Sequence, residues 1–152
     1  MTAKADESEM VRCPNCGKIN RVRSEATGVP HCGNCGHTLP WLTESGESDF
    51  PGVVEQSSLP VLVDFWAPWC GPCRIVSPVV EQIAKDLPGR LKLVKINSDN
   101  APNLSRRFGI RGIPTLVVFD HGKEVARVTG ALAAPALRAW VEEHLPRTAP
   151  KT

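Results

Sequence analysis

The most distinctive hydrophobic pattern of the chain is an apolar run at positions 61–66. Pro68 and Pro72 separate this run from a second apolar pattern that begins at Val76. Alternate residues of a strand face opposite sides, and here both sides are mostly apolar, which is typical of a strand buried on both faces of a sheet. Val76, Val80 and Ile83 then recur at helical spacing. We therefore expect a helix that begins near residue 70 and ends near residue 87.

Similar patterns continue to the end of the chain. They predict strands and helices at 91–97 (strand), 103–107 (helix), 116–120 and 124–129 (strands) and 137–145 (helix). Before the central strand we expect a short first strand at Trp41 and Leu42, and a short helix that ends at Gln56 with Ser48 as its N-cap. This order predicts an α/β fold, with a mixed central sheet and helices on both faces.

Two cysteines separated by two residues, Cys70 and Cys73, lie where the predicted central helix begins. Unpaired backbone N–H groups and the helix dipole favour a thiolate at this position. Cys73 would lie on the same face of the first turn, so the two sulfur atoms can meet. We expect Cys70 to be exposed and Cys73 to lie deeper, an arrangement suited to making and breaking a disulfide.

The other four cysteines form two further pairs, at Cys13 and Cys16 and at Cys32 and Cys35, with fifteen residues between the pairs. This spacing is typical of a four-cysteine zinc site. Few large apolar residues lie between positions 11 and 42, whereas a structural zinc ion contributes on the order of 10–16 kcal/mol to folding. We therefore predict a zinc ribbon that holds one structural Zn²⁺ ion through the four thiolates.

Alternative roles for these four cysteines stay open. Iron could occupy the same four-thiolate site, and two disulfides are a less favoured alternative. His31 and His37 flank the second pair, but we expect them to face solvent because four cysteines already complete a tetrahedron. Basic residues close to the first pair leave nucleic-acid binding open, although no aromatic residue accompanies them for base stacking.

Composition narrows the class of protein. The chain has 152 residues, 41% hydrophobic and 22% charged, and a formal net charge of +2 that is too small to indicate nucleic acid or a membrane surface as the main partner. The N-terminal residues lack the apolar core of a secretory signal, and no stretch has the ~20 apolar residues that span a bilayer. With six cysteines, these features predict a protein of the reducing cytoplasm, and we expect it to be a monomer.

The sequence Val-Asp-Phe-Trp-Ala-Pro-Trp-Cys-Gly-Pro-Cys at 63–73 resembles the active site of the thioredoxin family, and the resemblance extends over residues 41–145. With a zinc ribbon before it, the chain resembles the thioredoxin 2 group of bacteria. The resemblance implies a protein-disulfide reductase in which Cys70 is the nucleophile and Cys73 the resolving thiol. It also implies that an NADPH-dependent flavin enzyme, thioredoxin reductase, supplies the electrons, so that this chain binds no organic cofactor.

The resemblance assigns roles to further residues. Asp64 would accept a proton from the resolving thiol, Lys95 would lie near that aspartate, and Pro114 would follow a cis peptide bond. Together with Pro114, a shallow docking surface for substrate would include Trp69, Gly71, Pro72, Gly112, Ile113 and Gly130.

The chain is expected to have five segments. We expect a disordered N-terminus at 1–10, the ribbon at 11–42, a linker at 43–47, the thioredoxin domain at 48–146 and a loose tail at 147–152. Two alternative functions remain: a redox sensor that depends on zinc, and a chaperone-like binding protein in which the thiols are incidental.

Overall fold

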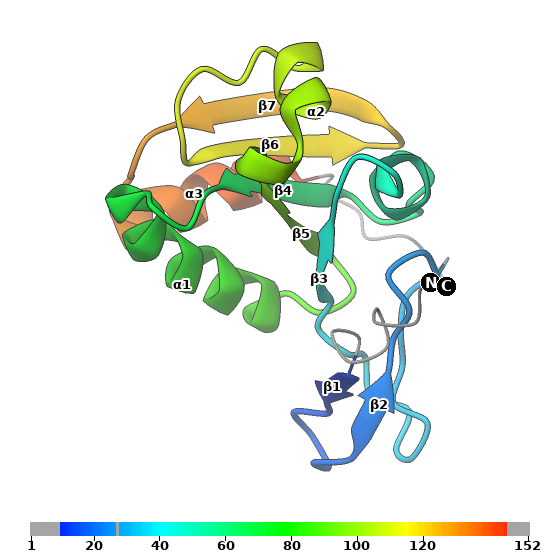
Figure 1. Cartoon of the computed structure of the whole chain (residues 1–152). Coiled ribbons are helices and arrows are strands. Elements are labelled where there is room, and N and C mark those ends of the chain that lie inside the picture. The colour runs from blue at the N-terminus through cyan, green and yellow to red at the C-terminus, as the bar shows by residue number, and fades with distance from the viewer. Residues whose placement is uncertain (1–9, 27, 146–152) are drawn as a thin grey trace.

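The computed structural model describes residues 10–26 and 28–145, which form a small two-stranded sheet and a larger five-stranded sheet flanked by helices (Figure 1). The expectations for residues 1–9 and for the tail at 147–152 lie outside the described residues. Met10, which we assigned to the disordered N-terminus, belongs to the first strand. Within the described ranges, no helix combines the length and the apolar character needed to cross a membrane.

The larger sheet has the strand order β3-β5-β4-β6-β7. Its strands are β3 (Leu42–Ser45), β4 (Val61–Trp66), β5 (Lys92–Asn97), β6 (Thr115–Asp120) and β7 (Lys123–Thr129). The first three are parallel to one another, whereas β6 runs antiparallel to β4 and β7 antiparallel to β6. The mixed sheet predicted from the sequence is therefore confirmed, with the apolar run at 61–66 as its central strand.

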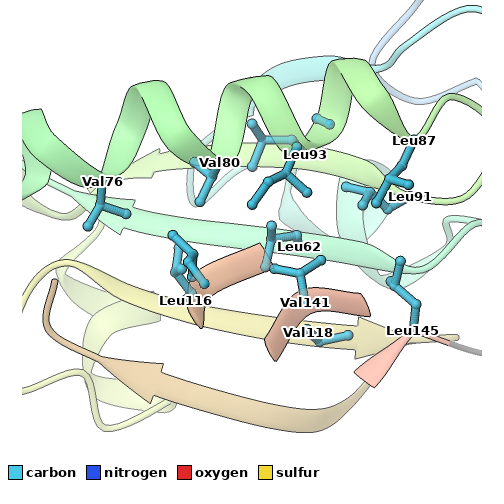
Figure 2. Packing of buried hydrophobic residues seen from close by; sticks show 13 residues of the cluster. Leu62, Val76, Val80, Leu87, Leu91, Leu93, Leu116, Val118, Val141 and Leu145 are labelled. Carbon is cyan, nitrogen blue, oxygen red and sulfur yellow. The ribbon is translucent and has the colours of Figure 1, made fainter. Parts of the chain in front are cut away.

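One face of this sheet packs against α1 (Gly71–Asp86) and α3 (Ala134–His144). Leu62, Leu93 and Leu116 point from the strands toward these helices, which contribute residues such as Val80 and Val141 (Figure 2). The spacing of the buried positions in α1 matches the helical pattern of the sequence, and burial of these side chains holds the helix against the sheet.

The opposite face is covered by a short π-helical turn, η2 (Pro51–Glu55), by the 3₁₀ helix η3 (Ser98–Asn100) and by α2 (Pro102–Arg107) (Figure 1). Phe50, Phe108 and Phe119 form an aromatic cluster there, with ring centroids 5.3–6.0 Å apart. Val63 and Phe65 of β4 point to this cluster, so the strand buries alternate side chains on the two faces, as its sequence predicts.

The N-terminal segment contains β1 (Met10–Arg12) and β2 (Ile19–Arg21), which pair antiparallel. It packs on the larger domain through a buried cluster that includes Trp41 and Leu59, and Lys92 lies beside this cluster. The ammonium group of Lys92 donates hydrogen bonds to the carbonyl oxygens of Ser24 and Val53, and it lies 4.3 Å from the Trp41 ring. The ribbon is thus tied to the sheet by apolar packing and by one buried cation.

Two local expectations differ from the structure. Residues 43–45, which we expected in a linker, form most of β3 and pair with β5, because a short edge strand needs little apolar patterning of its own. The prediction that Ser48 caps the next helix is wrong, because η2 has Phe50 as its N-cap and no side-chain cap bond. The Asp49 carboxylate instead closes the turn before η2, where it accepts hydrogen bonds from the Gly46 amide at 2.8 Å and the Ser45 hydroxyl at 2.9 Å. The division into two domains stays a prediction.

Candidate redox site and metal centre

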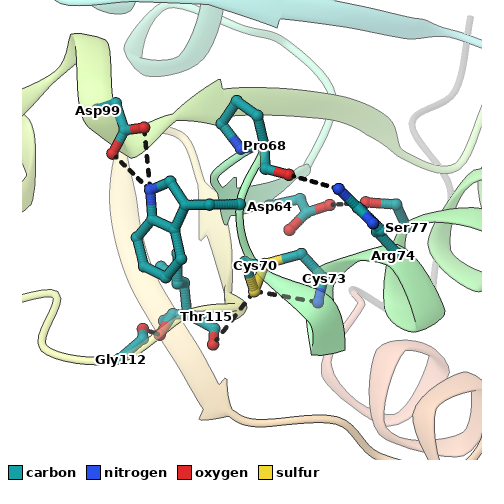
Figure 3. The surroundings of a disulfide bond; sticks show 11 residues. Asp64, Pro68, Cys70, Cys73, Arg74, Ser77, Asp99, Gly112 and Thr115 are labelled. Atoms are coloured by element: carbon teal, nitrogen blue, oxygen red, sulfur yellow. Dashed lines mark hydrogen bonds between the residues drawn. A yellow bond between two sulfur atoms is a disulfide. The ribbon is translucent and has the colours of Figure 1, made fainter.

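Cys70 and Cys73 lie where β4 ends and α1 begins, and they form a disulfide with Cα atoms 5.3 Å apart (Figure 3). Cys70 is the N-cap residue of α1, and its Sγ atom accepts a hydrogen bond from the Cys73 amide at 3.1 Å. An N–H group that points at this sulfur, together with the helix dipole, stabilises negative charge on it. The local geometry therefore favours a thiolate at Cys70 once the disulfide is reduced.

Cys70 and Cys73 are both buried in the disulfide form. Cys70 is 3% exposed and Cys73 is 2% exposed, so the expectation of an exposed Cys70 is wrong for this state. Ala67, Trp66 and Ile113 pack around the pair. A target must therefore approach along the rim of the site, past side chains that cover the disulfide.

The loop before β6 forms one wall of the site. The Ile113–Pro114 peptide bond is cis, as the family resemblance implied, and the Ile113 carbonyl oxygen lies 3.7 Å from the Cys70 Sγ atom. The Gly130 amide donates to the Pro114 carbonyl at 2.9 Å, and the Thr115 hydroxyl donates to the Gly112 carbonyl. These bonds hold the loop in the conformation in which Ile113 packs against Cys70.

Trp69 forms a second wall. Its side chain is among the most exposed large apolar groups described, at 69%, and its indole Nε1 atom donates to both carboxylate oxygens of Asp99, at 3.1 and 3.2 Å (Figure 3). Gly71 and Pro72 are also exposed beside it. Trp69, Gly71 and Pro72 are thus exposed next to Cys70, whereas Pro114 is buried, and a role of the predicted residues in docking stays a prediction.

Asp64 lies beneath the disulfide and is completely buried. Burial raises the pKa of its carboxyl group to about 6, although the positive charge of Lys95 and a hydrogen bond from Ser77 act in the opposite direction. The Ser77 hydroxyl donates to Asp64 Oδ2 at 3.3 Å, whereas Oδ1 has no hydrogen-bond partner among the described residues. A carboxyl group in this setting can change its protonation state near neutral pH.

Lys95 is the direct neighbour of Asp64 in the register between β4 and β5. Its ammonium group forms an ion pair with Glu81 at 2.9 Å and lies 5.2 Å from the Trp66 ring. The sequence expectation that Lys95 lies near the aspartate agrees with this placement, while a catalytic role for it stays a prediction.

The four remaining cysteines converge at the end of the ribbon. Their sulfur atoms all lie within 4.8 Å of one another, with Cys13 3.7 Å from Cys35 and Cys16 3.6 Å from Cys32. A tetrahedral zinc site with Zn–S bonds of about 2.3 Å places its sulfur atoms about 3.8 Å apart. The donor set therefore fits a zinc ion, and the two sulfur–sulfur distances of 3.6 and 3.7 Å are close to the tetrahedral spacing.

Two similar turns build this metal centre. Gly17 and Gly36 follow the second cysteine of each turn with φ angles of 83° and 81°, a conformation that glycine adopts without strain. In each turn the glycine amide donates to the carbonyl of the first cysteine, at 2.9 Å. This repeated backbone directs both sulfur atoms of a pair to one point.

Amide groups surround the sulfur atoms. The Asn15 side chain donates to Cys35 and the Asn34 side chain to Cys16, both at 3.4 Å, so each turn contacts the other turn's second cysteine. The pKa of Cys32 is lowered to about 6, chiefly because the Cys35 backbone amide donates to it. Such donors favour thiolates, which are the form that binds a metal ion. His31 and His37 are exposed, as expected, and do not belong to the cluster.

Sequence reasoning missed several residues that the structure brings to these sites. Ser77 has a signal that could have been used, because it follows Cys73 by four residues and therefore shares its face of α1. Asn15 and Asn34 occupy equivalent places between their cysteines, a second usable signal. Asp99 has no such sequence signal, because its contact with Trp69 joins segments that are thirty residues apart in the chain.

Comparisons with known proteins agree with this geometry. The family model described as "Thioredoxin" matches residues 42–143. Thioredoxin 1 of Nostoc sp. is 50% identical over 99 residues, which cover 65% of this chain and 92% of the relative. Thioredoxin C-3 of Corynebacterium nephridii is 41% identical over 139 residues, 90% of this chain and 95% of the relative. The second match is longer than the stretch from residue 42 to the C-terminus, so it extends into the N-terminal segment. The chain belongs to the thioredoxin family.

Proposed function

We propose that this protein reduces disulfides in other proteins by dithiol–disulfide exchange through Cys70 and Cys73. The observation that carries the proposal is the Cys70–Cys73 disulfide at the start of α1, beside the Ile113 carbonyl and the exposed Trp69. Membership of the thioredoxin family supports it, because protein disulfides are the substrates of that family.

The first step of the proposed reaction joins the protein to its target. The reduced Cys70 thiolate attacks one sulfur of a target disulfide, so that a bond forms between the two proteins and the target's own S–S bond breaks. The second target sulfur leaves with the electron pair. The amide of Cys73 and the start of α1 stabilise the Cys70 thiolate before attack and make it a good leaving group afterwards.

The second step releases the target. Cys73 loses its proton, Asp64 accepts that proton, and the Cys73 thiolate attacks Cys70. The bond between the proteins breaks, the reduced target leaves, and the Cys70–Cys73 disulfide forms. We infer that two electrons from NADPH, delivered by a thioredoxin reductase, then restore the dithiol, and that Lys95 contributes by favouring the Asp64 carboxylate.

We also propose that Cys13, Cys16, Cys32 and Cys35 hold one zinc ion. The sulfur spacing supports this, and so does the small apolar core of the ribbon. The ion would cross-link the two turns and fix the ribbon on the larger domain. This arrangement resembles the thioredoxin 2 group of bacteria, and the reducing cytoplasm would keep all six thiols available.

An insulin-reduction assay with NADPH and thioredoxin reductase tests the redox function. We expect turbidity from precipitated insulin chains with the wild-type protein and none above background with Cys70→Ser/Cys73→Ser. Persistent binding of unfolded protein by that double variant, together with an inert wild-type protein, would instead support the chaperone-like alternative.

A redox-responsive zinc site is a second candidate function. Cys16 and Cys35 are exposed, and each lies within 3.7 Å of a buried cysteine of the other turn, so an oxidant can reach a sulfur that has a partner for disulfide formation. Zinc release and insulin reduction should be followed together under peroxide. Release of zinc without a change in activity would discard regulation of the redox site by this centre.

A further inference from the structure

A cavity of about 210 Å³ lies beside Cys73, and its lining includes Cys73, Ser77 and Lys95. Asp64 does not line this cavity, because the carboxyl group is completely buried behind it. The only hydrogen bond to the Asp64 side chain among the described residues comes from Ser77.

Cys73 and Ser77 are four residues apart on α1, so their side chains lie on the same face of the helix, one turn from each other. Figure 3 shows Ser77 with its hydroxyl directed at Asp64, and Cys73 one turn earlier in the same helix. Ser77 therefore lines the same cavity as Cys73, and its hydroxyl contacts the buried Asp64 carboxylate.

We propose that Ser77 is a positioning residue of the redox site, whose hydroxyl orients the Asp64 carboxylate and favours its charged form, so that it can accept the proton that Cys73 loses. This inference rests on the proposed disulfide exchange. In the exchange, the Cys73 S–H bond breaks and the proton passes to the Asp64 carboxylate, which the Ser77 hydroxyl holds in place. The electron pair stays on Cys73, which then attacks Cys70, and the target sulfur leaves with the pair of the broken bond.

The charged and titratable groups around Asp64 are consistent with this role. Lys95 faces it from β5, while Glu81 and Cys73 face it from α1, and the residue opposite on β6 is the apolar Leu116. Lys95 is already paired with Glu81. Arg74 also lines the cavity, but its guanidinium donates to the Pro68 carbonyl, so Ser77 is the donor left for the carboxylate.

The test compares Ser77→Ala with Ser77→Thr, which keeps the hydroxyl, and with Ser105→Ala. Ser105 is a suitable control because its hydroxyl is buried without a hydrogen-bond partner among the described residues and lies in α2, on the opposite face of the sheet. Two quantities are measured: insulin reduction between about pH 5 and pH 9 with dithiothreitol as reductant, and the Asp64 titration by carboxyl ¹³C NMR of the disulfide form.

Loss of the Ser77 hydroxyl removes a hydrogen bond to the carboxylate, so the protonated acid is favoured. In Ser77→Ala we expect the acidic limb of the rate profile and the Asp64 titration to move to higher pH by roughly one unit. Ser77→Thr and Ser105→Ala should keep the wild-type profile. In an Asp64→Asn background, Ser77→Ala should cause no further change in the profile.

An unchanged pH profile in Ser77→Ala, or an equal shift in Ser77→Thr, would overturn the proposal. A further shift in the Asp64→Asn background would also overturn it, because Ser77 would then act independently of Asp64. Failure of the proposed function looks different: the wild-type protein would not reduce insulin at any pH, while the NMR titration would still decide whether Ser77 controls Asp64.

Discussion

Replacing Asp64 by asparagine removes a buried carboxyl group without changing the shape of the side chain. The pKa of Asp64 is raised from 3.8 to about 6 in the folded protein, chiefly by burial, so the folded state binds this proton more tightly than the unfolded state does. A shift of about two units corresponds to about 3 kcal/mol at 1.36 kcal/mol per unit. Since the charged form is the disfavoured one, this cost is fully present above about pH 6 and absent below about pH 4.

Urea unfolding of the disulfide form, followed by tryptophan fluorescence, measures the effect. Asp64→Asn should raise the free energy of unfolding by about 3 kcal/mol at pH 7.5, and the gain should shrink toward zero near pH 4. Asp86→Asn is the matched control. The pKa of Asp86 is lowered by hydrogen bonds from Gln82 and Arg138, so its replacement should reduce stability at neutral pH.

A stability gain of equal size at both pH values would refute the reasoning, because it would come from packing rather than from the cost of the buried charge. The same variant should also reduce insulin more slowly at neutral pH, since Cys73 loses its proton acceptor. A more stable protein that is less active would show that the buried carboxyl group is kept at a cost in stability.

Three further predictions concern the zinc centre, the junction of the two domains and the docking surface. Elemental analysis should find one zinc ion per wild-type chain, and Cys32→Ser should lower that content and expose the ribbon to proteolysis; unchanged zinc would contradict the four-thiolate site. Lys92→Ala should lower the free energy of unfolding by about 2–4 kcal/mol, because it leaves a cavity and removes the hydrogen-bond donor to two carbonyl groups. Lys123 is exposed, so the control Lys123→Ala should change the free energy of unfolding by less than about 0.5 kcal/mol. Asp99→Ala should raise the KM for insulin several-fold at nearly constant kcat, because it frees the Trp69 indole; an unchanged KM would remove Trp69 orientation from substrate docking.

Much of the fold was predictable because its central elements have strong periodic patterns. The strand at 61–66 and the helix after Cys70 are set by apolar residues at spacings of two and of three or four, and the structure places both where the pattern does. The two cysteines between them could be assigned to the start of a helix for the same reason. The edge strand β3 was only partly foreseen, because its four residues are mainly polar and it depends on pairing with β5.

The contacts that tune the candidate sites depend on tertiary structure and have weak sequence signals. Lys92 resembles a solvent-facing lysine at the start of a strand, but the ribbon folds over it and buries it. The burial of Cys70 was missed because Ile113, which helps to cover it, is more than forty residues away in the chain. Local patterns predict elements, whereas these contacts arise only when distant elements pack together.

Trapping of a mixed disulfide tests the central claim most directly. Cys73→Ser keeps the proposed nucleophile and removes the thiol that would release the target, so a target attacked by Cys70 stays attached. Mass spectrometry of this variant after incubation with insulin should identify a disulfide between Cys70 and an insulin chain, and Cys70→Ser should give no such adduct. Absence of the adduct, or attachment through a ribbon cysteine instead of Cys70, would contradict the account.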